Sequence, residues 1–139
     1  MQRLSVLIHQ QHPFHQIALH QACNAQGVYR VRLLDDPELS SQPLYAGAPT
    51  DLLILDQAMP VQPAKALIER LRNAAGVPAV LFVGRARIQQ ASLAHLAREQ
   101  GLCVVGELPW PLSTPAFGHA LRHARQLAKA ARPMPVAPL

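Results

Sequence analysis

The chain has 139 residues, of which 50% are hydrophobic and 15% are charged, and this is the size and composition of one compact globular domain. Such a hydrophobic content excludes a disordered tail or a coiled coil as the main structure, and no apolar run is long enough to cross a bilayer. The formal net charge is +5, but the basic residues are scattered and lack interleaved aromatic residues, so a solvated C-terminal helix is favoured over a nucleic-acid interface.

The first part of the chain predicts a strand, a helix and a second strand. Residues 4–8 are apolar almost throughout, and a helix is expected to start at Pro13 and to stop at Gly27, because proline fits the first helical turn and glycine ends helices. Residues 28–34 alternate between basic and apolar side chains, which is typical of a half-exposed edge strand. Residues 35–37 then carry a helix-start signature for a short or irregular helix.

The remainder of the chain alternates short apolar runs with longer helical periods. The apolar runs predict three strands, at 52–55, 79–83 and 102–105. The helical periods predict three helices, from Pro63 to Gly76, over 88–100 and from Pro115 to 132. Residues 133–139 contain three prolines and are interpreted as a frayed tail or a truncated linker. The folded domain is therefore expected to span 1–132.

Strands and helices that alternate in this way predict βαβ units, a parallel sheet and right-handed crossovers. An open parallel sheet places its chemistry at the carboxyl ends of its strands. The segments that follow the predicted strands supply that edge, and they are 9–12, Asp35, 56–60, 84–87 and 107–111. We therefore expect the functional site among these segments.

Several of these segments resemble CheY-like receiver domains of two-component response regulators in their order and spacing. Residues 51–60 (DLLILDQAMP) resemble the third strand of that family, which ends in a phosphoryl-accepting aspartate and is followed by Met-Pro. Residues 6–13 (VLIHQQHP) match the first strand, 79–84 (AVLFVG) the fourth, and 101–111 (GLCVVGELPWP) the fifth with its Lys-Pro motif. The last segment is most similar to receivers attached to EAL-type cyclic-di-GMP phosphodiesterase regulators.

The resemblance implies a flavodoxin-like α/β fold of the (βα)5 type. Its five-stranded parallel sheet would have the order 2-1-3-4-5, with helices on both faces. The resemblance also implies that Asp56 is the equivalent of the phosphoacceptor and that the Trp110–Pro111 peptide bond is cis, since X-Pro bonds adopt the cis form at low cost.

The chain departs from the family at the positions that carry the chemistry. The family's acidic pair, which holds Mg²⁺ together with the acceptor aspartate, aligns with Gln10 and Gln11, whose amides carry no charge. The family's hydroxyl on the fourth strand aligns with Gly84, and its lysine, which counters the phosphoryl charge, aligns with Trp110, a single neutral donor. Trp110 either fills the mouth of the pocket or points outward as an interface anchor.

These departures predict a degenerate receiver, a protein-interaction or dimerisation module whose state is not set by Mg²⁺-dependent phosphorylation. We expect no enzymatic activity, no metal and no cofactor. The partner would be another signalling protein or a second copy, docking on the face made by the helix at 88–100, the strand at 102–105 and the final helix. The residues expected on that face, where they are not buried, are Leu93, Leu96, Leu102, Val104, Phe117, Leu121, Arg122 and Arg125.

Three alternatives stay open. In the first, Asp56 is a working phosphoacceptor for a histidine kinase, with Mg²⁺ as cofactor. In the second, the crevice at the strand edge serves a small enzyme or a nucleotide binder, although it lacks paired titratable groups. In the third, the final helix binds nucleic acid with strongly salt-dependent affinity. In the plain structural interpretation, Asp56 is a strand-ending residue that caps the next loop.

Other titratable residues have a plain structural interpretation. Asp35 and Asp36 offer substitute carboxylates at the same edge, but helix caps are favoured. His119 and His123 have the spacing of zinc ligands without a third ligand, which favours two surface histidines.

The two cysteines, Cys23 and Cys103, form neither a disulfide framework nor a metal-ligand spacing. Both are expected to be small buried residues in a reducing compartment. No secretory signal pattern opens the chain, and together these features favour the cytoplasm.

Overall fold

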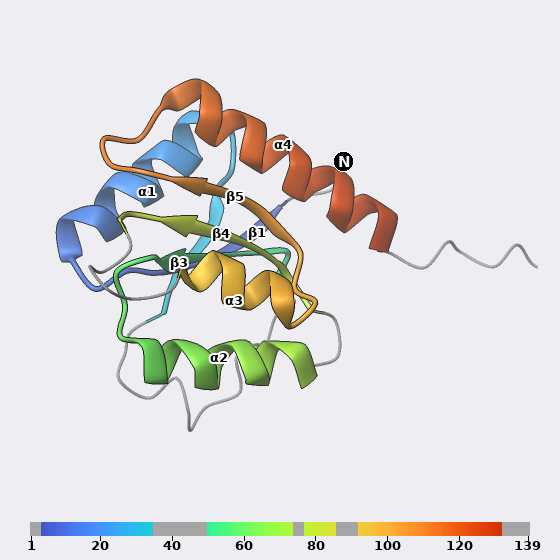
Figure 1. The fold of residues 1–139 in the computed structure, drawn as a ribbon. Helices are drawn as coiled ribbons and strands as arrows, with labels where there is room; N and C mark the ends of the chain where they lie inside the picture. The colour runs from blue at the N-terminus through green and yellow to red at the C-terminus, as the bar shows by residue number, and fades with distance from the viewer. Residues whose placement is uncertain (1–3, 35–49, 74–76, 86–91, 132–139) are drawn as a thin grey trace, which may run out of the picture.

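The sheet of the molecule has five parallel strands. The structure is a computed structural model that describes residues 4–34, 50–73, 77–85 and 92–131. The strands are β1 (Ser5–His9), β2 (Arg30–Leu33), β3 (Leu52–Asp56), β4 (Ala79–Val83) and β5 (Val104–Leu108). They lie in the order β2-β1-β3-β4-β5 (Figure 1), and every pairing is parallel. The predicted order 2-1-3-4-5 is therefore confirmed, with β2 at an edge as its alternating sequence indicated.

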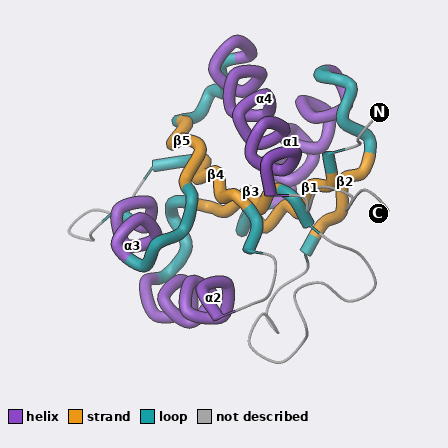
Figure 2. Tube along the Cα trace, turned by 90° about the vertical axis from the view of Figure 1, so that its right-hand side faces the viewer, coloured by secondary structure: helices purple, strands orange, loops and turns teal. Residues whose placement is uncertain are grey.

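The helices cover both faces of this sheet. They are α1 (Pro13–Ala25), α2 (Val61–Asn73), α3 (Leu93–Glu99) and α4 (Thr114–Ala131). Figures 1 and 2 show α1 and α4 on one face and α2 and α3 on the other. β1, β3 and β4 are buried at every residue, because strands sandwiched between two helical layers must be apolar on both faces.

Each face of the sheet has its own hydrophobic core, because side chains alternate along a strand. Under α1 and α4, the main contributors are Val6, Ile8, Leu52, Ile54, Leu81 and Val83 from the strands and Leu19, Phe117, Leu121 and Ala124 from the helices. Under α2 and α3, they are Leu7, Leu53, Leu55, Val80 and Phe82 from the strands and Leu67, Ile68, Leu71, Leu93 and Ala97 from the helices. Both cores meet β3, and β3 therefore holds Asp56 in a fixed position.

The first helix begins and ends where the sequence predicts. Pro13 takes the first helical position, and the side chain of His12 accepts a hydrogen bond from the backbone N–H of Phe14 at 3.3 Å. Gly27 follows the last turn with a φ of +79°, a conformation that costs glycine little and that therefore suits the end of a helix.

The next helix starts before its predicted residue, and a serine caps the one after it. α2 begins at Val61 and not at Pro63, since a proline is tolerated throughout the first turn, where the backbone N–H has no acceptor within the helix. α3 begins at Leu93, and residues 88–91, where its start was predicted, lie outside the described residues. Ser92 is its N-cap, and the Ser92 hydroxyl accepts from the backbone N–H of His95 at 3.4 Å.

The last strand lies further along the chain than predicted, at Val104–Leu108 and not at 102–105. The prediction followed the apolar run, which Gly106 and Glu107 interrupt. Gly106 fits inside the strand because a side chain of the neighbouring strand β4 lies close to it. A Cβ at Gly106 would stand 3.4 Å from Cδ1 of Leu81. Glu107 fits because its side chain is bound on the α3 side of the sheet.

The expectation of two buried cysteines is wrong for one of them. Cys23 is buried in the core under α1, whereas Cys103 is exposed. Cys103 follows the buried Leu102 in the extended segment that enters β5, and successive side chains of an extended segment point to opposite sides.

Some predictions concern residues that the structure does not describe. The helix expected after 35–37, the start of the helix predicted from 88, and the tail at 133–139 all lie outside the described residues. Among the described helices, none is long and apolar enough to span a membrane.

Candidate functional site

The carboxylate of Asp56 lies at the carboxyl end of β3 and is 5% exposed. Its Oδ2 accepts a hydrogen bond from the backbone N–H of Gln11 at 3.1 Å, and its Oδ1 accepts one from the backbone N–H of Ala58 at 2.9 Å. Each oxygen therefore has a backbone donor, which stabilises a buried carboxylate. These bonds also tie the segment after β1 to the segment after β3.

Gly84, the first residue after β4, lies directly against this carboxylate. A Cβ at Gly84 would stand 3.3 Å from Oδ1 of Asp56 and 3.8 Å from Nε1 of Trp110. The backbone φ of Gly84 is +112°, a value that residues with a side chain rarely adopt. The position aligned with the family's hydroxyl thus has a backbone shaped for glycine.

Trp110 follows the end of β5, the strand on the opposite side of β4 from β3. Its peptide bond to Pro111 is cis, as predicted. The indole is half-buried, packs against the core under α1 and α4, and stacks on His15 of α1 with ring centroids 4.2 Å apart and planes 18° apart. The indole therefore packs on α1 and does not point outward, and its role at the mouth of the Asp56 pocket stays a prediction.

The two glutamines aligned with the acidic pair are placed differently. The Gln11 side chain is exposed, and the residue contributes its backbone N–H to Asp56. Gln10 is 2% exposed, and neither its amide oxygen nor its amide nitrogen has a hydrogen-bond partner among the described residues. Nε1 of Trp110 is buried without a partner there as well. A buried polar atom without a partner costs about 1–3 kcal/mol.

The described residues at this edge do not fit Mg²⁺. Mg²⁺ is a hard cation that favours several charged oxygen ligands in octahedral geometry. The described donors are one carboxylate, Asp56, whose oxygens already accept backbone hydrogen bonds, and the neutral amide of Gln10. No group of three His, Cys, Asp or Glu side chains among residues 4–34, 50–73, 77–85 and 92–131 is arranged to hold a metal. Asp35 and Asp36 lie outside those ranges.

A polar network next to the site was not predicted from the sequence. Gln57, which follows Asp56 and is 4% exposed, donates from Nε2 to Oε1 of Glu107 at 3.0 Å and accepts from the backbone N–H of Ala94 at 3.3 Å. Glu107 also accepts from the Ser92 hydroxyl at 3.2 Å and from Arg98 at 3.1 Å. The network joins the end of β3 to both ends of α3 and to β5.

The network lowers the pKa of Glu107. Partial burial alone would raise that pKa. The hydrogen bonds from Arg98, Ser92 and Gln57 act in the opposite direction, and so does the positive charge of Arg98; together they bring the pKa below the usual value for glutamate. From the sequence alone, Glu107 is only a charged residue within an apolar segment. Its bonded role could not be predicted, because its hydrogen-bond partners are up to 50 residues away.

The face expected to dock a partner is formed by α3, β5 and α4. Four of the residues assigned to it are buried in the cores and cannot contact a partner, namely Leu93, Leu102, Phe117 and Leu121. Leu96 and Val104 are half-buried, and Arg122 and Arg125 are exposed. The exposed part of α3 carries the ion pair Arg98–Glu107 at 3.1 Å and a contact of 2.9 Å between Nε2 of His95 and Oε1 of Glu99, which is an ion pair when the imidazole is protonated.

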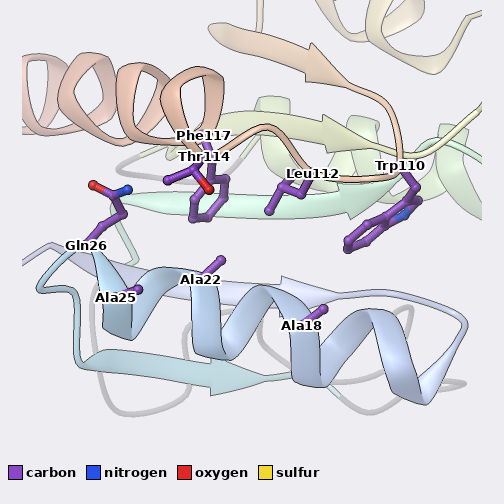
Figure 3. A pocket seen from close by; sticks show the side chains of 8 residues that line it. All are labelled: Ala18, Ala22, Ala25, Gln26, Trp110, Leu112, Thr114 and Phe117. Carbon is purple, nitrogen blue, oxygen red and sulfur yellow. The ribbon is translucent and has the colours of Figure 1, made fainter.

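An apolar cleft opens beside Trp110, between α1 and the start of α4 (Figure 3). Its volume is about 160 Å³. The α1 side carries Ala18, Ala22, Ala25 and Gln26, and the opposite side carries Trp110, Leu112, Thr114 and Phe117.

Comparison with solved structures identifies the fold. A signal receiver domain of an HD domain-containing protein from Pseudomonas fluorescens is 19% identical, with a TM-score of 0.73, over 93% of this chain and 99% of that one. A response regulator from Colwellia psychrerythraea is 18% identical, with a TM-score of 0.66, over 90% and 99%. A putative pilus assembly-related protein from Burkholderia pseudomallei is 22% identical, with a TM-score of 0.69, over 88% and 90%.

No family model matches the chain. No curated protein matches it either. At these identities the structural similarity establishes the fold, and the chain has the flavodoxin-like receiver fold that its motifs resemble. The particular similarity to receivers of EAL-type regulators stays a prediction.

Proposed function

We propose that this protein is a degenerate receiver domain of the two-component type, which acts in the cytoplasm as a protein-interaction module and not as an enzyme. Its state would not be set by Mg²⁺-dependent phosphorylation of Asp56. The observation that carries the proposal is the set of groups around that carboxylate, which are two backbone N–H groups, Gly84 and the indole of Trp110.

Charge neutralisation is what this site lacks. Phosphoryl transfer is catalysed mainly by positioning and by electrostatic stabilisation of charge on the phosphoryl oxygens. The described groups that bond or abut the Asp56 carboxylate, which are the backbone N–H groups of Gln11 and Ala58 and the backbone of Gly84, are neutral. The position aligned with the family's lysine holds Trp110, whose nitrogen is a neutral donor. A phosphoryl group on Asp56 would therefore lie beside buried neutral groups, at a high cost in free energy.

A second feature supports a state that is fixed without phosphorylation. Gln57 is bonded both to Glu107 on β5 and to the backbone of α3. These contacts hold the start of α3 against the end of β3 without any added group. The α3–β5–α4 face would then be presented in one conformation.

This face also suits a second copy of the chain as its partner. An isologous dimer interface must be complementary to itself. The α3–β5 part carries both signs of charge in a small area, with Arg98 beside Glu107 and Glu99 beside His95. Exchange of these pairs across a two-fold axis would give a homodimer, and a partner regulator is the other occupant that we propose for this face.

The alternative function is that of a phosphoreceiver served by a histidine kinase. The retained carboxylate at the end of β3 favours it, since that is the position the family uses. In this alternative Asp56 accepts the phosphoryl group and Mg²⁺ must draw its other ligands from outside the described donors.

Beryllofluoride, a mimic of the aspartyl phosphoryl group, separates the two proposals. With Mg²⁺ and beryllofluoride added, we expect the amide NMR spectrum of the wild type to change no more than that of Asp56→Asn. Saturable shifts of the amides of Asp56, Gly84 and Trp110 in the wild type, absent from Asp56→Asn, would establish the alternative.

A further inference from the structure

A line of side chains along α4 faces α1. Thr114 lines the cleft between the two helices, and a Cβ at Gly118 would stand 3.2 Å from Oε1 of Gln26, just after α1. Residues three and four apart share one side of a helix. Three exposed basic residues continue the line from Thr114 and Gly118, and they are Arg122, Arg125 and Lys129. Arg122 and Arg125 therefore lie on the α1 side of α4 and not on the side that faces β5, where they were expected.

The line of basic residues continues the apolar cleft. Trp110 stands at one end of the cleft and Gln26 at the other, beyond which α4 runs on (Figure 3). The α1 wall is made of small side chains, which leave room for one entering group, and the buried Phe117 closes the floor of the cleft. A volume of about 160 Å³ is close to that of cavities that hold one benzene-sized molecule. The apolar cleft and the basic line that α4 carries on beyond the end of α1 are together called the groove below, with the cleft as its apolar half and the line on α4 as its basic half.

Acidic residues are absent from both walls of this groove. The sequences of α1 and α4 contain no Asp or Glu. The acidic residues that the structure describes are on other elements, at Asp51, Asp56, Glu69, Glu99 and Glu107. The positive charges of the groove therefore have no anionic partner on its own helices.

We propose that the groove between α1 and α4 binds an acidic amphipathic helix of a partner protein. The apolar side chains of that helix would enter the cleft, and its carboxylates would pair with Arg122, Arg125 and Lys129. The line from Thr114 to Lys129 is about 22 Å long at 1.5 Å per residue, so a helix of about 15 residues covers it. The interaction needs neither Asp56 nor the α3–β5–α4 face.

The positive charge of the groove favours an acidic helix over a second copy of the chain as its occupant. A second copy would bring the same basic line against this one, and like charges placed together weaken an interface. Nucleic acid would satisfy the basic half of the groove but would place phosphates beside the apolar half, where the half-buried ring of Trp110 is already stacked on His15.

Binding of three synthetic 15-residue peptides to the full chain tests the proposal. The first has leucines on one helical face and glutamates elsewhere, the second has lysines in place of the glutamates, and the third has the composition of the first in scrambled order. We expect saturable binding of the first peptide, with ¹⁵N shifts of Ala18, Leu112 and Arg125. We expect no binding of the lysine peptide and at least about threefold weaker binding of the scrambled one.

Variants on the two halves of the groove give the matched controls. The double variant Arg122→Glu/Arg125→Glu should bind the first peptide about tenfold more weakly, since it replaces two exposed ion pairs by repulsion. Lys65→Glu, an exposed reversal on α2, should bind like the wild type. Ala18→Leu, which fills the cleft, should weaken binding without moving the midpoint of thermal unfolding by more than a few degrees. If it does not fold, the NMR shifts in the wild type decide.

Three results would overturn the proposal. The first is no saturable binding of the glutamate peptide up to about 1 mM, which is the range of the weakest specific complexes. The second is binding with shifts outside the groove or without loss in the double reversal. The third is that a 15-base-pair DNA duplex binds more tightly than the peptide and shifts the same residues, which would assign the groove to nucleic acid.

Discussion

Gly84 shows, at the level of one residue, why a single substitution would not easily give the site around Asp56 the family's hydroxyl. The family's hydroxyl would have to stand on a backbone whose φ is +112° and with a Cβ 3.3 Å from Oδ1 of Asp56. A side chain at this position is therefore both strained and too close to the carboxylate.

The substitution Gly84→Ser tests this geometry. We expect it to lower the free energy of unfolding by about 1–3 kcal/mol, because the residue keeps an unfavourable φ and approaches Asp56. Urea unfolding measures the change. Gly101→Ser is the matched control, since Gly101 also has a positive φ, +85°, but nothing lies within 4 Å of its Cβ position. Equal losses for the two variants would show that close contact with Asp56 adds nothing.

The two cysteines differ in a way that a thiol reagent measures. Burial raises the pKa of the Cys23 thiol to about 12, so its reactive thiolate is scarce at neutral pH. Cys103 is exposed. One thiol per chain should react quickly with iodoacetamide in the native protein, and peptide mapping should place the label on Cys103. Cys103→Ser should remove the fast reaction, and fast labelling of Cys23 would contradict the described core.

At the level of elements, the network around Glu107 connects the loop after β3 to α3 and β5. Its strength depends on the ionised carboxylate, because that group accepts the hydrogen bonds from Gln57, Ser92 and Arg98. The pKa of Glu107 is lower in the folded protein than the usual value. Ionisation therefore adds stability above the pKa of the unfolded chain, and that stability is lost as the pH falls through the folded-state pKa.

Glu107→Gln tests this contribution. The Glu107 side chain is 40% exposed, so solvent screens its ion pair, and we expect the substitution to cost less than about 1 kcal/mol of unfolding free energy at pH 7. The difference from the wild type should shrink as the pH is lowered from 7 toward about 3, because Glu107 becomes protonated as the pH falls through its folded-state pKa, which lies below the usual value. Urea titrations at the two pH values measure it, with the exposed Glu69→Gln on α2 as control. A loss that persists unchanged at low pH would exclude the electrostatic origin.

Elements with a strong apolar pattern were predictable from the sequence, and their ends were less so. β4 was predicted at its observed residues, since five consecutive apolar residues specify a buried strand. β5 was misplaced because Gly106 and Glu107 enter the strand through contacts with distant residues. The start of α3 depends on the Ser92 cap, and the apolar period on which the prediction rested cannot show it.

The candidate site was also predictable in part from the sequence. The sequence motifs identified Asp56, Gly84 and Trp110 as neighbours, because parallel strands bring their carboxyl ends together. The stacking of Trp110 on His15 and the bonding of Gln57 were not predicted, since both depend on side-chain orientation. The groove between α1 and α4 likewise needs the relative position of two helices that lie far apart in the sequence.

At the scale of the whole molecule, the two helical layers present different surfaces. The α1–α4 layer has no acidic residue on its helices, whereas α3 and β5 carry paired charges of both signs. The first surface suits an oppositely charged partner, and the second suits a copy of itself.

Sedimentation of the full chain tests the proposed homodimer. We expect the wild type to sediment as a dimer at concentrations of about 100 µM, a range in which moderately stable interfaces are occupied. Leu96→Glu, a change at a half-buried residue of α3, should shift the protein to the monomer, and Lys65→Glu on α2 should not. A wild type that stays monomeric, or a dimer unaffected by Leu96→Glu, would contradict the homodimer and leave a partner regulator as the occupant of this face.

The chemistry at Asp56 is tested most directly by the mass of the intact protein after incubation with acetyl phosphate and Mg²⁺. The neutral surroundings of the carboxylate predict that the wild type gains no more phosphoryl adduct than Asp56→Asn does. A phosphoryl adduct on the wild type that is absent from Asp56→Asn, and that disappears when Mg²⁺ is chelated, would contradict the account.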